Sequence, residues 1–300
     1  MPASNSLKKE EEFMMNEEKI AILTDSGCDV PVEFVSGRDD IFVVPLRVSF
    51  KDAEYKDDGS LSREKIQEML DVGGVKTSLP TGEDVIRAIE EIKERGFKRV
   101  FVITISSGLS GTFNFIKLIC EDFKELEFCF LDTKNIGMGS GFSVLYAAGE
   151  IDAKASFEDV VSSTTKVCSS TAVYFCLMTL EYLRRGGRIG LVEGALGSLF
   201  NIKPVISCNR DGIYCTVAKK MGYNSAIEEV IALVKERVQT HAKYNLVVAY
   251  GELTETVSVL CSRLKQIFPQ CKKILRSGIS SALTVHTGLS LIGVGVQVIE

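Results

Sequence analysis

Apolar runs and helix-spaced segments alternate along the first half of the chain. Short apolar runs over residues 19–24, 98–105 and 127–132 predict buried strands, and apolar residues recur at three- and four-residue spacing over 113–120 and 157–169. Strands that alternate with helices in this way are typical of a parallel sheet covered on both faces. We therefore predict an α/β fold whose first half holds a parallel, Rossmann-like sheet.

Shorter signals fill the intervals between these segments. Residues 41–50 predict a further strand with an edge or a bend at Pro45, because proline cannot donate to a sheet. Residues 55–59 predict a turn. Ser62 and Thr81 each precede a helix-spaced segment, so we expect them to cap two helices through their side-chain oxygens.

The pattern changes after about residue 170. The run Asn-Arg-Asp-Gly at 209–212 separates two apolar runs and predicts a β-hairpin. Helices and strands then follow in mixed order, and the last segment, 284–299, alternates enough to predict a strand or a strand pair. We therefore predict a disordered leader over 1–18, an α/β domain over 19–170 and a mixed-sheet domain with helices over 171–300.

The composition is that of a soluble globular protein, with 45% hydrophobic and 25% charged residues. The net charge of −5 comes from interspersed charges of both signs, which argues against a nucleic-acid partner. Nine cysteines without C-x-x-C spacing and only two histidines give no metal-ligand pattern, so we expect reduced, buried thiols and no metal or cofactor.

Neither end of the chain predicts insertion into a membrane. The first residues lack the apolar core of a signal peptide, and the uncharged stretch over 277–298 contains glycines, hydroxyl residues and a histidine that make it a poor span. We expect a cytoplasmic protein without stable membrane insertion.

The run I-S-S-G-L-S-G-T at 105–112 joins a predicted buried strand to a predicted helix. Backbone N–H groups at the start of a helix lack partners within it, and the helix dipole favours negative charge there. Small residues allow an anion to approach the backbone closely. We therefore predict an anion pocket at this turn, with Ser106, Ser107 and Ser110 as candidate hydroxyl contacts.

Three further residues stand in segments that suit a polar binding site. Thr77 lies in Thr-Ser-Leu-Pro, an extended segment before a proline. Its hydroxyl either faces the same crevice as Ser107 or only forms a turn that caps the next helix. Arg188 follows two glycines that let the backbone turn sharply and aim its guanidinium, but it also suits an exposed loop. His286 lies in a largely apolar segment, as a ligand contact or as a core residue.

Two other functions are compatible with these residues. Ser107 and His286 would serve as nucleophile and base of an acyl-ester hydrolase, although the G-x-S-x-G signature of a nucleophile elbow is absent. The glycine-rich run at 137–141 is an incomplete dinucleotide fingerprint, which leaves a nucleotide or small-molecule binder open; a tightly packed helix start is the favoured interpretation. No P-loop motif supports nucleotide hydrolysis.

Several short runs form a specific set when taken together. They are A-I-L-T-D-S at 21–26, V-P-L at 44–46, K-T-S-x-P at 76–80, I-S-S-x-L-S-G-T at 105–112, L-D-T at 131–133, L-E-Y-L-x-x-G-G-R-I at 180–189 and I-K-P-V at 202–205. In this order the set resembles the DegV family of bacterial fatty-acid-binding proteins, and the resemblance extends from residue 19 to about residue 290.

The resemblance implies two α/β domains that enclose a long-chain fatty acid, in a protein that does no chemistry itself. It implies that Thr77 and a serine of the turn, here Ser107, hold the carboxylate, with Arg188 and His286 close to it. Some members of the family present the acid to a separate kinase that makes the acyl phosphate. A fatty acid kinase is therefore the implied protein partner.

Overall fold

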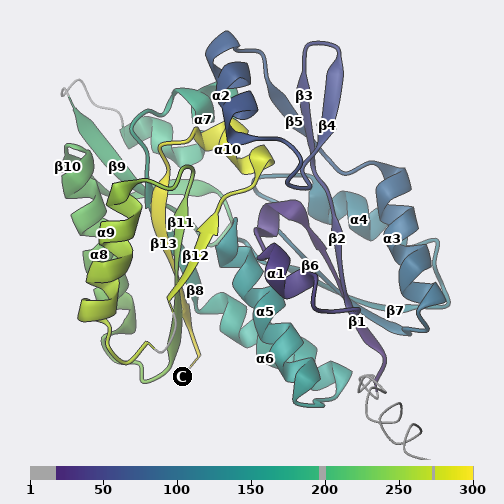
Figure 1. Ribbon diagram of the computed structural model, residues 1–300. Helices are drawn as coiled ribbons and strands as arrows, with labels where there is room; N and C mark the ends of the chain where they lie inside the picture. The colour runs from purple at the N-terminus through teal and green to yellow at the C-terminus, as the bar shows by residue number, and fades with distance from the viewer. Residues whose placement is uncertain (1–17, 196–200, 272–273, 300) are drawn as a thin grey trace, which may run out of the picture.

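The computed structural model describes residues 18–195, 201–271 and 274–299 and arranges them in three β-sheets with helices packed around them (Figure 1). The leader expected over 1–18 lies outside these residues, apart from Glu18. A parallel four-stranded sheet is built from the first half and a mixed six-stranded sheet from the second. The predicted α/β class is confirmed, and the domain boundary near residue 170 stays a prediction.

The parallel sheet has the strand order β2-β1-β6-β7. Its strands are β1 (Ile20–Asp25), β2 (Ile41–Val44), β6 (Arg99–Thr104) and β7 (Glu127–Asp132). The helices on its two faces are α3 (Gly82–Glu94) and α4 (Thr112–Cys120) on one side, and α5 (Met138–Asp152) and α6 (Phe157–Ser169) on the other. Both faces are buried, which explains why these strands are nearly continuous apolar runs.

The mixed sheet has the order β10-β9-β8-β13-β11-β12, and only β11 and β12 are parallel neighbours within it. Its strands are β8 (Thr171–Cys176), β9 (Ile202–Cys208), β10 (Tyr214–Met221), β11 (Tyr244–Tyr250), β12 (Ile274–Gly278) and β13 (Ile292–Val298). Helices α8 (Tyr223–Val238) and α9 (Glu255–Ile267) bury one face of it. The sequence also predicts a strand over 272–275; residues 272–273 lie outside the described ranges, and β12 is described from Ile274.

Helix α5 packs between the two large sheets, against β1 and β6 on one side and β8 and β13 on the other (Figure 1). Its glycine-rich start allows very close contacts. A Cβ on Gly139 would lie 2.3 Å from Asn135 Oδ1, and one on Gly141 would lie 2.4 Å from the carbonyl oxygen of Cys28. The glycines at 137–141 therefore serve tight packing, as the favoured interpretation of this run predicted.

A third, antiparallel sheet of order β4-β3-β5 was not predicted. It consists of β3 (Arg47–Phe50), β4 (Ala53–Lys56) and β5 (Lys76–Ser78). The chain bends at Pro45, where the single strand expected over 41–50 is divided into β2 and β3, and part of the turn expected over 55–59 is the end of β4. Strand β5 of this sheet carries the candidate binding residue Thr77.

The prediction that 284–299 is a strand or a strand pair is wrong for its first part. Residues Ser281–Thr287 form helix α10, which Ser280 caps by accepting a hydrogen bond from the N–H of Leu283. Gly288, with φ of 70°, ends the helix before β13 begins. The β-branched residues and alternating polarity mimic a strand, but tertiary packing of α10 overrides that local preference.

The remaining helices are α1 (Val32–Val35), α2 (Arg63–Val72) and α7 (Glu181–Arg185), with short 3-10 turns η1 (Ser26–Cys28) and η2 (Gly190–Ala195). Ser62 and Thr81 cap α2 and α3 as predicted, since their side chains accept from the N–H groups of Lys65 and Asp84. Five cysteines, Cys28, Cys120, Cys168, Cys176 and Cys261, are buried, and the other four are partly buried. No helix in the described ranges combines the length and apolar character needed to span a membrane.

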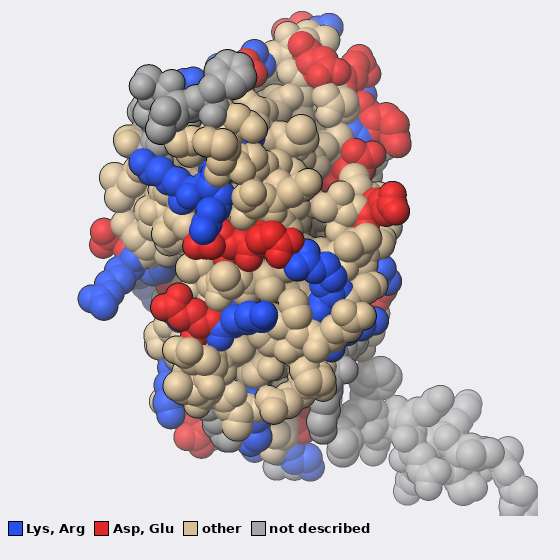
Figure 2. All heavy atoms as spheres, turned by 90° about the vertical axis from the view of Figure 1, so that its left-hand side faces the viewer, with Lys and Arg blue, Asp and Glu red and all other residues tan. Residues whose placement is uncertain are grey.

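The face formed by α8, α9 and the adjoining edge of the mixed sheet carries charges of both signs side by side on a largely uncharged surface (Figure 2). Arg263 pairs with Glu228, and Lys220 pairs with Glu229. This side of the molecule therefore carries no extended field of one sign.

Candidate ligand cavity between the sheets

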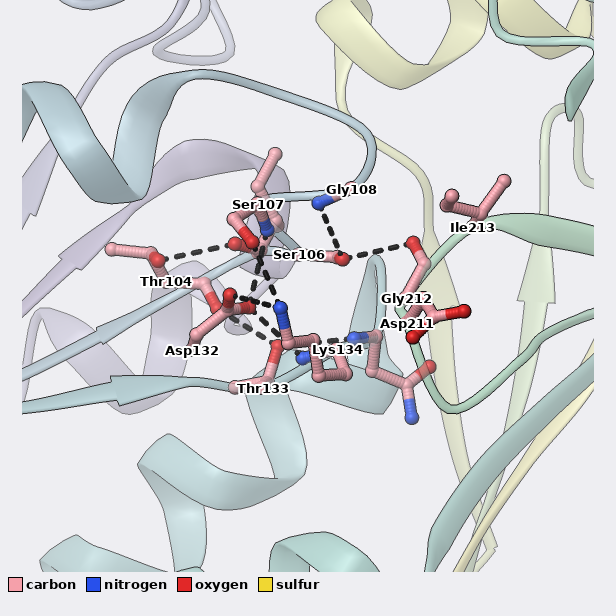
Figure 3. Close-up of polar contacts among 12 residues, drawn as sticks. Thr104, Ser106, Ser107, Gly108, Asp132, Thr133, Lys134, Asp211, Gly212 and Ile213 are labelled. Carbon is pink, nitrogen blue, oxygen red and sulfur yellow. Dashed lines mark hydrogen bonds and ion pairs between the residues drawn. The ribbon is translucent and has the colours of Figure 1, made fainter.

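The serine turn, residues 105–112, connects β6 to α4 and packs against the turn between β9 and β10 (Figure 3). Ser106 Oγ donates a hydrogen bond to the carbonyl oxygen of Gly212 (2.8 Å) and accepts one from the N–H of Gly108 (3.0 Å). A Cβ on Gly212 would lie 1.9 Å from Ser106 Oγ. Ser106 is fully buried and joins two segments that are far apart in sequence.

The backbone N–H groups of the serine turn already have acceptors within the protein. Those of residues 106–110 and 112 donate, in order, to Asn135 O, Asp132 Oδ1, Ser106 Oγ, Ser106 O, Ser106 O and Ser110 Oγ. The prediction of an anion pocket made from unpaired N–H groups is therefore wrong at these positions. Hydroxyl and carboxylate side chains close to a turn compete for its N–H groups, and this local pairing prevails here.

Ser107 lies at the outer side of the turn. Its Oγ accepts a hydrogen bond from Lys134 Nζ (2.9 Å), and Lys134 is also paired with Asp132 at 2.7 Å (Figure 3). Ser107 lines a shallow surface hollow next to Gly187 and Gly190. Ser110 also lines this hollow and in addition lines an internal cavity, which Ser107 does not, while its hydroxyl contacts Thr112 Oγ1 at 2.8 Å.

Thr77 and His286 meet in that internal cavity although more than two hundred residues separate them. Strand β5 presents Thr77 and the last turn of α10 presents His286, and Thr77 Oγ1 lies 2.7 Å from His286 Nε2. The contact is made by the Thr77 hydroxyl, which the sequence predicts to be held in an extended Thr-Ser-Leu-Pro segment. The interpretation of Thr77 as only a turn former is therefore not supported, since Thr81 makes the cap of α3.

His286 is held neutral at physiological pH. Burial, together with the positive charge of Arg188, lowers the pKa of its imidazole from 6.5 to about 4. Its Nδ1 is buried and has no hydrogen-bond partner among the described residues. A Cβ on Gly186 would lie 2.1 Å from this atom, so the glycine is required for the ring to fit.

Arg188 follows α7 and the glycine pair at 186–187 and reaches the same cavity. Its Nε donates to the carbonyl oxygen of Leu109 (3.2 Å) and its Nη1 to that of Gly186 (2.8 Å). Nη2 makes no hydrogen bond to any residue that the structure describes. The guanidinium is thus fixed by two backbone carbonyls with one donor group left for a ligand.

The cavity that these residues line has a volume of about 200 Å³. Its polar side chains are those of Thr77, Ser78, Ser110, Arg188 and His286, and Tyr214 adds a phenol hydroxyl to its lining residues. The other lining residues are Leu46, Leu79, Ile105, Leu109, Ile136, Tyr214, Ala282 and Leu283. We call it the head cavity, because all of its charge and most of its polarity are gathered in these few side chains.

A second, narrow cavity of about 40 Å³ adjoins the head cavity, and Ile136, Tyr214 and Leu283 belong to the walls of both. We call it the tail cavity. It lies between α5, α10 and the mixed sheet, and its walls include Val173, Phe175, Val247, Leu291 and Val294. Asp29 is the one residue of its wall with an ionisable carboxyl group, and no sequence motif marks Asp29 for a role.

The arrangement argues against a serine hydrolase. His286 Nε2 contacts a threonine hydroxyl, and Ser107 Oγ contacts a lysine. A nucleophile requires its base within hydrogen-bond reach, and Ser107 is placed with a cation instead. What the side chains do form is a closed polar end joined to an apolar extension.

The structure is that of an α/β protein with three β-sheets, in which a cavity with several polar side chains adjoins a largely apolar one. A sequence model described as "Uncharacterised protein, DegV family" matches residues 19–298. The chain therefore belongs to the DegV family. A DegV domain-containing protein of Clostridium acetobutylicum is 35% identical over 281 residues, covering 92% of this chain and 98% of that one. One from Clostridium perfringens is 31% identical over 280 residues, covering 93% and 99%.

Solved structures give the same fold over nearly the full length. A fatty-acid-binding DegV family protein from Thermus thermophilus is 27% identical with a TM-score of 0.86, covering 93% of this chain and 99% of that one. A stearic-acid-binding protein from Eubacterium ventriosum is 28% identical with a TM-score of 0.82, covering 93% and 98%. The fatty acid kinase B3 protein of Streptococcus pneumoniae, loaded with linoleic acid, shares the fold at 24% identity and a TM-score of 0.78, covering 93% and 99%.

Proposed function

We propose that this protein binds one long-chain fatty acid, with the carboxylate in the head cavity and the hydrocarbon chain in the tail cavity. The observation that carries the proposal is the junction of the two cavities at Ile136, Tyr214 and Leu283, which gives one site a polar and an apolar end. The fatty acids bound by the Thermus thermophilus and Eubacterium ventriosum relatives support the same ligand class.

The head cavity suits a carboxylate because its donors are held in place beforehand. A buried carboxylate without partners is costly, and Thr77, Ser110 and Arg188 together offer two hydroxyls and a cation. We assign the serine contact to Ser110, since both serines line the outer hollow but only Ser110 also lines the head cavity. Thr77 and Ser110 come from the proposed first domain, 19–170, and Arg188 and His286 from the second, 171–300.

The tautomer of His286 decides what Thr77 can donate. If the imidazole carries its proton on Nε2, that N–H donates to Thr77 Oγ1 across the 2.7 Å contact, and the threonine O–H points to the carboxylate. Nδ1 is then an unprotonated nitrogen against Gly186, which leaves no buried N–H without an acceptor. We therefore assign the Nε2–H tautomer.

The hydrocarbon chain supplies most of the affinity. Burying about fourteen methylenes at ~0.8 kcal/mol each contributes roughly 11 kcal/mol before costs. Lost motional freedom and ordering of the chain offset several kcal/mol, which leaves a Kd near micromolar or tighter. The tail cavity is narrow, so its apolar side chains must move apart as the hydrocarbon enters.

In this proposal the protein is a cytoplasmic carrier without catalytic activity, and it presents the acyl group to a fatty acid kinase. The relative from Streptococcus pneumoniae supports that partner, since it is itself a fatty acid kinase B3 protein. A bound chain buried in the tail cavity leaves the carboxylate as the end that a second protein reaches.

Native mass spectrometry of the purified protein tests the proposal. We expect an unmodified fatty acid at one copy per chain, and an upward shift in Tm with added stearic acid but not with ATP. Stabilisation by nucleotide alone would instead support the nucleotide binder. Turnover of an acyl ester that disappears in Ser107→Ala would support the hydrolase.

A further inference from the structure

Asp29 holds an unusual position between η1 and α1. Its φ of 51° lies in the left-handed region, which aspartate tolerates better than most residues, and its N–H donates to the carbonyl oxygen of Ser26 (3.1 Å). Its Oδ1 accepts a hydrogen bond of 2.8 Å from the N–H of Ser280, the cap of α10. One carboxylate oxygen thus fixes the start of the helix that carries His286.

The other oxygen, Oδ2, is buried and has no hydrogen-bond partner within the described ranges of the chain. Asp29 is 8% exposed. A Cβ on Gly137 would lie 2.9 Å from Oδ2 and 3.5 Å from Leu283 Cδ1, and Gly137 and Leu283 both line the tail cavity. Oδ2 therefore lies against the wall of the tail cavity, among apolar neighbours.

The charged neighbours of Asp29 do not satisfy this oxygen. Arg63 is close enough to interact with Asp29 electrostatically, but its guanidinium donates to Ile279 O and Thr284 Oγ1. Asp57, which also lies near, accepts from the N–H groups of Ser281 and Ala282. Burial is the main cause that raises the pKa of Asp29 well above its usual value.

The tail cavity is largely apolar, although Tyr174, Tyr214 and Thr287 also line it, and an unpaired buried oxygen in its wall is costly for a ligand whose chain is hydrocarbon throughout. A ligand hydroxyl would remove the cost in either protonation state, because it donates to a carboxylate and accepts from a carboxylic acid. A hydroxyl in a purely apolar tube would lose its hydrogen bonds to water without replacement, so plain chains would then be preferred.

We propose that Asp29 makes the tail cavity selective for fatty acids that carry a hydroxyl group in the interior of the chain, bonded to Oδ2. The inference rests on the proposed fatty-acid function and adds the substrate class. Ser280 and His286 are six residues apart on α10, or about 9 Å along the helix axis. The hydroxyl therefore belongs well away from the carboxylate, at an inner carbon.

Competition binding on the wild-type protein tests this, with stearic acid against positional isomers of hydroxyoctadecanoic acid and native mass spectrometry as the readout. We expect one interior isomer to bind about tenfold or more tighter than stearic acid, and isomers hydroxylated next to the carboxyl to bind more weakly. If every isomer binds more weakly than stearic acid, the inference is overturned and the fatty-acid function stands. If no fatty acid binds at all, the proposed function itself fails.

Two variants test whether Asp29 Oδ2 causes the preference for hydroxylated fatty acids. Asp29→Asn keeps an acceptor for Ser280 and places an amide at the position of Oδ2, so the best hydroxy isomer should still outcompete stearic acid. Asp29→Gly tolerates φ of 51° and removes the carboxyl, so the ratio of the two affinities should fall to one or below. Retention of the wild-type ratio in Asp29→Gly would refute the assignment.

Discussion

The serine turn and the head cavity are both polar and lie side by side, but their hydrogen bonds differ. In the serine turn, Ser106 and the N–H groups around it bond to one another and to the β9–β10 turn. In the head cavity, Nη2 of Arg188 makes no hydrogen bond to the described residues, and the Thr77 hydroxyl has His286 as its one hydrogen-bond partner among them. A satisfied network marks a structural joint, and unsatisfied donors and acceptors mark a place for a ligand.

The joint depends on close approach of two backbones. Gly108 lies so near the hairpin that a Cβ on it would be 2.7 Å from Asp211 O, and Gly212 has φ of 75°. Two sheets from different halves of the chain meet through these glycines (Figure 3). The positions of Ser110 and Arg188 across the head cavity are set by this contact.

The largest effect is expected from Gly212→Ala, which would break the structural joint. The new methyl would lie 1.9 Å from Ser106 Oγ, and the alanine backbone would have to adopt a φ of 75°. Overpacking and backbone strain together should lower the free energy of unfolding by roughly 4 kcal/mol. Urea unfolding measures it, and Gly149→Ala is the matched control because nothing lies within 4 Å of its Cβ. Equal stability of the two variants would contradict the joint.

The second prediction concerns how the stability of the ligand-free protein depends on pH because of the buried imidazole of His286. The folded pKa of His286 is lowered from 6.5 to about 4, so the unfolded chain binds the proton more readily between these values. Neutral His286 therefore adds stability above about pH 6.5 that is lost as the pH falls toward 4, up to about 3 kcal/mol. Chemical unfolding of wild type and His286→Gln from pH 7 to pH 4 should show a steeper decline for wild type.

The variant is needed because a second group titrates in the opposite sense. Burial raises the pKa of Asp25 from 3.8 to about 7, so its contribution is present at low pH and is lost as the pH rises through about 7. Asp25 is retained in both proteins, and the difference between their curves isolates His286. Parallel curves would show that the imidazole is not held neutral by its surroundings.

Thr77→Val should weaken fatty-acid binding by about 1–3 kcal/mol, because it keeps the shape of the side chain but removes the hydroxyl that, in the proposed site, donates to the carboxylate. Lipid-exchange titration with stearic acid measures the change. Valine suits a strand, so β5 should remain folded, but the buried Nε2–H of His286 loses its acceptor and the free energy of unfolding should fall by about 1–3 kcal/mol, as urea unfolding would measure. Undiminished affinity would remove Thr77 from the site.

The parallel sheet was predictable because its central strands are buried on both faces and so appear as apolar runs at 19–24 and 98–105. The edge strand at 127–132 is only partly buried but is also rich in apolar residues. The caps at Ser62 and Thr81 were predictable because their chemistry is local. Helix α10 and the sheet that holds β5 were not, since each is short and is stabilised by contacts with distant segments rather than by its own pattern.

The head cavity was predictable in its residue types but not in its geometry. Thr77, Arg188 and His286 stood out as polar residues in constrained or apolar segments, and all three line one cavity. Which serine lines the cavity with them was not predictable. In a tight turn, neighbouring residues point in different directions, and the sequence pattern does not say which hydroxyl faces inward. Asp29 was not predictable from the sequence, because only the tertiary structure shows that one of its carboxylate oxygens has no hydrogen-bond partner among the described residues.

The smallest effect separates Ser107 from Ser110. Ser110 lines the head cavity, so Ser110→Ala should weaken stearic acid binding by about 1 kcal/mol or more. Ser107→Ala removes an exposed contact with Lys134 and should change both affinity and stability by less than about 0.5 kcal/mol. Each change removes one hydroxyl group from the same turn, so each variant is the control for the other in one lipid-exchange assay. The opposite ranking would mean that the carboxylate lies in the outer hollow, and that the turn serves as ligand site as well as joint.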